Sequence, residues 1–81
     1  MPRFYINFRS GGSTAKDGQG IECATLEEAR TTALASAREL LAGDIKSESK
    51  TPLEAVIIMS ESGQELMTIP ARDVLPEPLR P

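Results

Sequence analysis

The 81-residue chain has no histidine and no tryptophan, and it has one cysteine, Cys23. Without histidine it cannot form Ser–His–Asp or Cys–His nucleophile systems, and it lacks the commonest transition-metal ligand. A lone cysteine excludes an internal disulfide and argues against a structural zinc site. The carboxylates do not show the spacing of a calcium loop, and no carboxylate–lysine pair is held on one rigid element. We therefore expect a protein that is not an enzyme and has no metal or cofactor.

Long hydrophobic runs and clusters of positive charge are also missing. No apolar run approaches the ~20 residues that span a bilayer. The segment MPRFYINFRSGG lacks the apolar core of a signal peptide, so we expect a cytoplasmic protein with no membrane partner. Nine basic and twelve acidic residues give a net charge of −3. The basic residues are scattered, and this pattern disfavours nucleic-acid binding.

The segment RFYINFR alternates strictly between apolar and polar residues, which predicts a half-buried strand. Phe4, Ile6 and Phe8 form its apolar face. Its polar face is a candidate binding stripe of one aromatic among basic residues, made of Arg3, Tyr5, Asn7 and Arg9. Such a stripe can stack on and neutralise single-stranded nucleic acid. Because one aromatic is too few for a stacking platform, we favour the ordinary solvent face of a sheet.

Residues 10–20, SGGSTAKDGQG, predict a glycine-rich turn, and GIEC predicts a short returning strand. A helix then begins at Thr25, which forms a T-x-x-E capping box with Glu28. Gly43 is placed to end this helix. The helix carries an apolar stripe of Leu26, Ala29, Ala33, Ala37, Leu40 and Leu41. Small alanines at its centre allow close packing on a sheet. We interpret Cys23 as a small, partly buried apolar residue near the helix entrance.

LEAVIIMS and ELMTIP predict a second hairpin around the turn ESGQ. The order is strand, short strand, helix, strand, strand. It predicts an α+β fold: a two-layer antiparallel sheet in ββαββ order with a single helix packed on one face. We expect one domain over residues 1–75 and a proline-rich flexible tail over residues 76–81.

The second hairpin has two apolar faces. If Ser60 pairs with Glu65, one face carries Val56, Ile58, Met67 and Ile69, and the other carries Ala55, Ile57, Met59 and Leu66. One helix is too narrow to cover both faces of four strands. We therefore expect a homodimer or a small protein partner to bind the face of Ile57, Met59 and Leu66. The alternative is that residues 71–79 fold back over this face.

The chain resembles a family of short bacterial proteins known only as a domain of unknown function. The resemblance rests on PRFYINFR, DGQGIE, LEEARTTALASARELLA and ELMTIPARDVL. It implies a fold and a bacterial, cytoplasmic setting, but no activity.

The segment GIECATLEEAR is also similar to HicB-like antitoxin domains. The shared residues are Gly20, Thr25, Leu26, Glu27, Glu28 and Ala29. HicB-like proteins bind a small toxin ribonuclease, and many carry an added DNA-binding element that these 81 residues do not show. Our first interpretation is thus a self-associating, non-enzymatic interaction or regulatory module. The alternative is a HicB-like antitoxin or regulatory partner of a small toxin protein.

Overall fold

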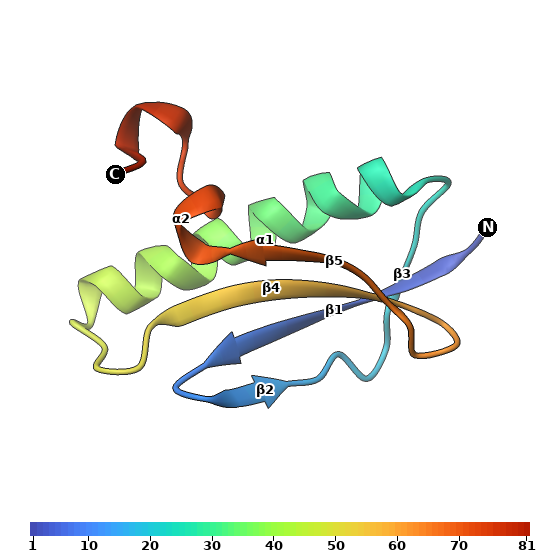
Figure 1. Cartoon of the computed structure of the whole chain (residues 1–81), viewed down its shortest axis with the longest axis horizontal. Helices are drawn as coiled ribbons and strands as arrows, with labels where there is room; N and C mark the ends of the chain where they lie inside the picture. Colours follow the sequence, from blue (N-terminus) through green and yellow to red (C-terminus); the bar gives the residue numbers. More distant parts are fainter.

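The computed structural model describes residues 1–81 and confirms the predicted α+β fold, in which one long helix packs against one antiparallel sheet (Figure 1). The sequence did not predict the short strand Ser13–Ala15 or the 3-10 turn Glu77–Leu79, whereas the short helix Ala71–Val74 lies where ARDVL allowed one more short element. The elements are β1 (Arg3–Ser10), β2 (Ser13–Ala15), β3 (Ile21–Glu22), α1 (Leu26–Lys46), β4 (Leu53–Ser60), β5 (Glu65–Pro70), α2 (Ala71–Val74) and the 3-10 turn η1 (Glu77–Leu79).

The strands lie in the order β2-β1-β4-β5, and β3 pairs with the beginning of β1 beyond the end of β2. All pairings are antiparallel. β1 and β4, the two strongly patterned apolar strands, are therefore central. The outer edges of the sheet belong to β2 and β5.

Two bulges determine which side chains of the second hairpin face α1. Arg9 lies opposite Ala55 and Ser10 lies opposite Leu53, which leaves Glu54 without a partner. The extra residue lets both Leu53 and Val56, three positions apart, join the core under α1.

The second bulge corrects the predicted register of the hairpin. Glu65 lies opposite Met59, not opposite Ser60. The Ser60 N–H instead donates to the Gln64 carbonyl at 2.8 Å. Because Ile58 pairs with Met67, Leu66 is the extra residue here. The predicted α1-facing set of Val56, Ile58, Met67 and Ile69 is nevertheless confirmed.

The core lies between α1 and the sheet. Ala29, Ala33 and Ala37 are fully buried, so the helix axis approaches the strands closely, as predicted. Leu40 was wrongly placed on this stripe, because its side chain is 40% exposed. Leu34, which the prediction omitted, is buried instead. The core cluster consists of Phe4, Ile6, Cys23, Ala29, Ala33, Leu34, Ala37, Leu53, Val56, Ile58, Ile69 and Val74.

The predicted start of α1 is confirmed and its predicted end is wrong. The Glu28 N–H donates to Thr25 Oγ1 at 3.2 Å, and Glu28 Oε2 accepts from the Ala24 N–H at 2.9 Å. At the other end, α1 continues through Gly43 to Lys46. Asp44 lies in this extra turn, and its Oδ2 accepts the N–H of Leu53 at 2.9 Å. This bond ties the last turn of the helix to the start of β4.

The segment after β5 packs on the α1 side of the sheet. Val74 of α2 is fully buried in the core, and its carbonyl accepts a bond from Arg38 Nε of α1 at 2.8 Å. The idea that residues 71–79 fold back over the other face of the sheet is therefore wrong. The backbone of residues 76–81 turns away from the sheet (Figure 1), and Arg80 reaches back to donate to the carbonyls of Leu75 and Asp73 at 3.0 and 3.3 Å.

Candidate interaction surface

The face of the sheet opposite α1 is not covered by another layer of the chain. The predicted polar stripe of β1 lies here, and its four side chains, Arg3, Tyr5, Asn7 and Arg9, are half-buried. Tyr5 lies opposite Met59 of β4, and Asn7 lies opposite Ile57. The structure thus brings the two predicted sets of site residues together on one surface, which we call the open face.

The predicted apolar set is less exposed than expected. Ile57 is only 8% exposed, Met59 is half-buried, and Leu66 is 36% exposed. Ile57 lies between Asn7 on one neighbouring strand and Thr68 on the other. Polar neighbours on both sides thus shield Ile57. The exposed apolar part of the open face therefore reduces to Met59 and Leu66.

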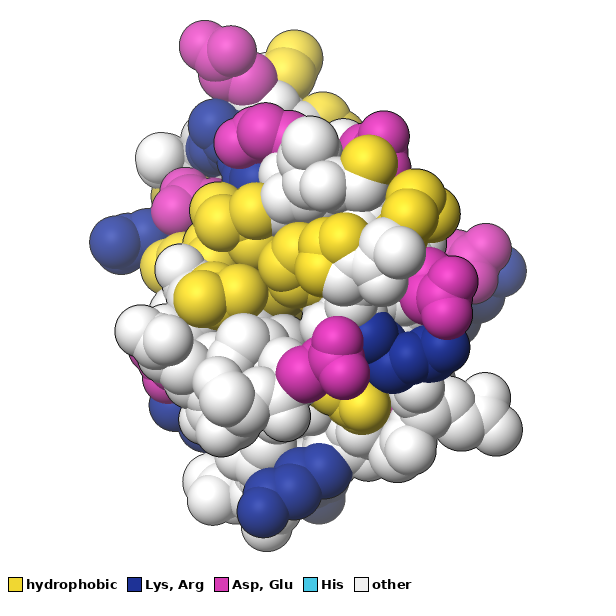
Figure 2. Space-filling view, turned by 90° about the vertical axis from the view of Figure 1, so that its right-hand side faces the viewer, with side chains coloured by type: hydrophobic (Ala, Val, Ile, Leu, Met, Phe, Trp, Pro, Cys, Tyr) yellow, Lys and Arg dark blue, Asp and Glu magenta, His cyan; other side chains and the backbone are white.

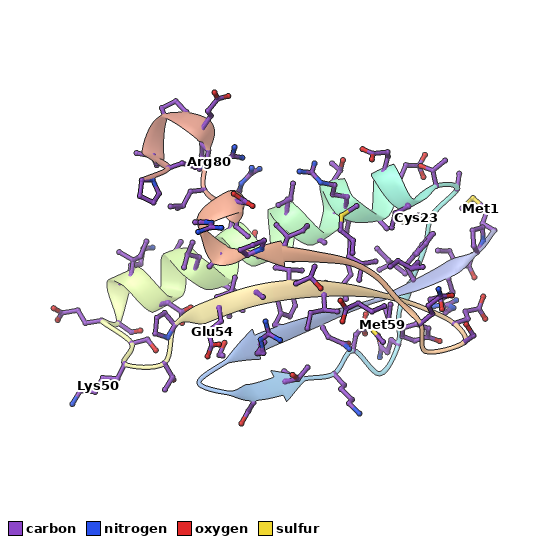
Figure 3. All side chains as sticks on the ribbon, viewed as in Figure 1. Met1, Cys23, Lys50, Glu54, Met59 and Arg80 are labelled. Carbon is purple, nitrogen blue, oxygen red and sulfur yellow. The ribbon has the colours of Figure 1, made fainter.

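A shallow hollow of about 370 Å³ lies on the open face beside the β4–β5 turn. Tyr5, Asn7 and Met59 line it, whereas Arg3, Arg9, Ile57 and Leu66 do not. In Figure 3, Met59 lies toward the end of β4 that enters this turn, and Glu54 lies near the other end. The full lining is Tyr5, Asn7, Lys16, Asp17, Met59, Ser60, Glu61 and Gly63.

Asp17 organises the rim of this hollow. Its Oδ2 accepts the N–H of Ile6 at 3.2 Å, and its Oδ1 accepts the N–H groups of Gln19 and Gly20, both at 3.0 Å. The Asp17 N–H in turn donates to Asn7 Oδ1 at 3.0 Å. Partial burial alone would raise the pKa of Asp17. The three N–H bonds and the charge of Arg3 outweigh burial and lower the pKa below its ordinary value of 3.8.

The two arginines of the stripe are close to carboxylates. Arg3 Nη2 lies 2.8 Å from Glu22 Oε1, and Arg3 Nη1 donates to the Gln19 carbonyl at 2.8 Å. Arg9 Nε lies 4.0 Å from Glu54 Oε2. These pairs reduce the net positive charge of the open face, which makes it a weak match for a phosphate backbone.

The described residues offer no cluster for metal chemistry. No group of three or more Cys, Asp or Glu side chains is arranged to hold an ion. Cys23 is a free thiol beside the beginning of α1, as predicted (Figure 3), and it is buried, whereas the sequence predicted partial burial. No helix has the length and apolar character needed to cross a bilayer.

Sequence reasoning missed a second surface, a groove between α1 and β2. Its larger part, about 810 Å³, includes Phe8, Ala15, Ser36, Glu39 and Leu40. A smaller part of about 330 Å³ continues past Ala15 and Ser36 toward Lys16. The sequence did contain one indication of this groove. Leu40 and Leu41 are successive, so they point about 100° apart around the helix, and Leu40 lies at the edge of the buried stripe.

The end of the molecule that carries the N-terminus and the β4–β5 turn also shows hydrophobic side chains gathered together (Figure 2). Acidic and basic side chains surround them in this view. An apolar area with a charged rim is a common feature of protein-binding surfaces.

The chain matches no curated protein and no solved structure. A family model described as "Domain of unknown function (DUF6894)" matches residues 3–72, which run from the start of β1 into α2. It covers the open face, the Asp17 loop and the groove. The chain therefore belongs to the DUF6894 family of domains of unknown function.

Proposed function

We propose that the protein is a small, non-enzymatic interaction module that binds a protein partner through the open face of its sheet. The observation that carries this proposal is the hollow where Tyr5, Asn7 and Met59 meet. An aromatic ring, an amide and a flexible thioether offer the mixture of apolar and hydrogen-bonding groups that interfaces favour.

The hollow is held in one geometry before any partner arrives. Asn7 and Asp17 are bonded to each other, and Asp17 is bonded to the backbone of β1. A surface that is already ordered loses little conformational entropy on binding. Lys16 and Glu61 on the rim carry opposite charges, so a partner can be oriented by charge as well as by shape.

The same geometry argues against catalysis in the hollow. Asp17 is the carboxylate beside Lys16, but its oxygens accept three backbone N–H groups. Its lowered pKa also makes it a weak base. This carboxylate therefore serves the loop and is poorly suited to proton transfer.

The HicB-like alternative ranks second, because the residues that carry that similarity have structural roles. Gly20 fits a crowded backbone position, and Thr25 and Glu28 cap α1. A small basic toxin would suit the net charge of −3. The setting that we propose for either function is the bacterial cytoplasm.

The proposal is tested by replacing Tyr5 with a photo-crosslinking phenylalanine analogue in the cells that make the protein. The matched control places the same analogue at Ala35, an exposed residue on α1 that lines none of the hollows. We expect one discrete adduct from position 5 and none from position 35. Equal adducts from both positions, or none from either, would contradict the proposal.

The captured partner then allows a quantitative test with purified proteins. Met59→Glu should weaken binding by about tenfold or more, because it places a charge in a desolvated contact. Ala35→Glu should leave the affinity unchanged. An adduct formed only with a second copy of the chain would show that the open face serves self-association.

A further inference from the structure

The two outer edges of the sheet differ in how they are protected. Natural sheets guard their edges with charges, prolines or covering segments, because an unguarded edge pairs with another strand. β5 ends in Pro70, and the hollow along it is also lined by the charged residues Arg30, Asp73 and Arg80. β2 is short, with three residues, but it has neither a protecting charge nor a proline, since residues 10–15 read SGGSTA.

The backbone of Thr14 faces outward from the edge of β2. The Ile6 N–H points away from β4, because it donates to Asp17 Oδ2. The backbone N–H and carbonyl groups of successive residues in β1 point to opposite sides. Those of Phe8 therefore point toward its partner Ala15, as in Ile6, and those of Arg9 point toward β4. Thr14, the partner of Arg9, must then direct its N–H and carbonyl away from β1. These groups are available to a further strand.

The groove beside β2 has opposite charges at its two ends. Glu39 lines it near Ser13, and Lys16 lines it beyond Ala15. Suppose that β2 of a second copy lies antiparallel beside this β2, with the two Thr14 residues opposite each other. Lys16 of each copy then lies near the end of the groove where Glu39 of the other copy is. The surface is therefore complementary to itself under a two-fold rotation, which is the symmetry of most homodimers.

We propose that the chain forms a homodimer in which β2 pairs antiparallel with β2 of a second copy, with Thr14 on the two-fold axis. The two Thr14 residues exchange N–H···O bonds and join the two sheets into one. The groove closes from both sides, which covers the exposed side of Leu40 and the half-buried ring of Phe8. This contact shares Lys16 with the rim of the hollow on the open face, but it does not depend on that face binding a partner.

The test is sedimentation velocity of the full chain over a range of concentrations, with edge variants. We expect a wild-type dimer. Thr14→Pro removes the outward N–H and should raise the dimer Kd by about tenfold or more. Thr14→Lys keeps the hairpin intact and places like charges on the axis, so it should also give monomers. Thr68→Pro is the matched control, because Thr68 of β5 faces outward on the guarded edge, and it should leave the dimer intact.

A charge exchange tests the predicted register. Lys16→Glu and Glu39→Lys should each raise the dimer Kd by about threefold, and the double variant should restore it. Circular dichroism shows whether each variant is folded. A wild-type chain that stays monomeric at millimolar concentration would overturn the proposal. So would a dimer that Thr14→Lys leaves intact, or one that Met59→Glu on the open face dissociates.

Discussion

At the scale of single residues, the loop between β2 and β3 depends on the carboxylate of Asp17. Three backbone N–H groups converge on it, including that of Ile6 in the next strand. The sequence predicted only a tight Asp17–Gly18 turn at this point. It could not show that the aspartate reaches across to β1, because that contact depends on how β2 and β3 pair with β1 on either side of Ile6.

Removing this carboxylate should destabilise the fold in a pH-dependent way. Asp17→Ala should lower the free energy of unfolding by about 1–2 kcal/mol near pH 7, because charged hydrogen bonds at a partly exposed site are lost. The pKa of Asp17 is lower in the folded chain than its ordinary 3.8, so its charge stabilises the fold at neutral pH. That contribution disappears as the pH falls through the folded pKa.

Urea unfolding at several pH values measures both the loss of stability and its dependence on pH. The difference in unfolding free energy between wild type and Asp17→Asn should be largest near pH 7 and should shrink toward about pH 3. A difference that stays constant over this range would show that the charge of Asp17 does not stabilise the loop.

Gly20 and Gly18 form a matched pair for a second prediction. Gly20 has φ +75°, and a Cβ there would lie 2.8 Å from Arg3 Cγ and 3.0 Å from the Phe4 carbonyl. Gly18 has a negative φ and open space around it. Gly20→Ala should therefore cost about 2 kcal/mol or more. Gly18→Ala should change stability by less than about 0.5 kcal/mol in the same thermal melts.

At the scale of elements, the buried face of α1 can be tested with two leucines. Leu34 is 9% exposed and belongs to the core, whereas Leu40 is 40% exposed. Leu34→Ala should lower the free energy of unfolding by about 2–4 kcal/mol. Leu40→Ala should cost less than about 1 kcal/mol. Similar losses in chemical unfolding would mean that the helix is rotated about its axis.

Periodicity predicted the types of the major elements, because β1, α1 and β4 follow clear apolar patterns. It was less able to predict ends and registers. Gly43 was read as a stop, but the bond from Asp44 to Leu53 belongs to a helix that continues. The bulges at Glu54 and Leu66 leave no mark in the alternation. They depend on how neighbouring strands pair, which the sequence of one strand does not specify.

The candidate site was also predicted only in part, because alternation within a strand predicts faces but not which residues of neighbouring strands meet. Tyr5, Asn7 and Met59 were each identified from alternation, and strand pairing brings them together. The burial of Ile57 was not foreseen, because it depends on Asn7 and Thr68 of the neighbouring strands. Lys16 and Asp17 were missed as rim residues, since a loop offers no periodicity from which its position can be read.

At the scale of the whole molecule, the chain after β5 is part of the body only as far as α2. A chain ending at Pro70 loses Val74 from the core and the acceptor of Arg38. Its Tm should fall by roughly 10 °C or more. A chain ending at Leu75 should melt within about 3 °C of wild type, because the removed residues are exposed and the bonds from Arg80 to Leu75 and Asp73 are exposed as well. Equal melting of the two shortened chains would contradict this division.

The single thiol of Cys23 can report local opening of the fold. Cys23 is 7% exposed in the core beside α1, and its backbone N–H donates to the Pro2 carbonyl at 3.1 Å. A thiol reagent can reach it only when the start of α1 lifts from the sheet. Since no other sulfhydryl competes, the labelling rate reports how often that end of the molecule opens. A partner or a second copy that closes this end of the molecule would slow the labelling, and no substitution in the chain is needed to detect it.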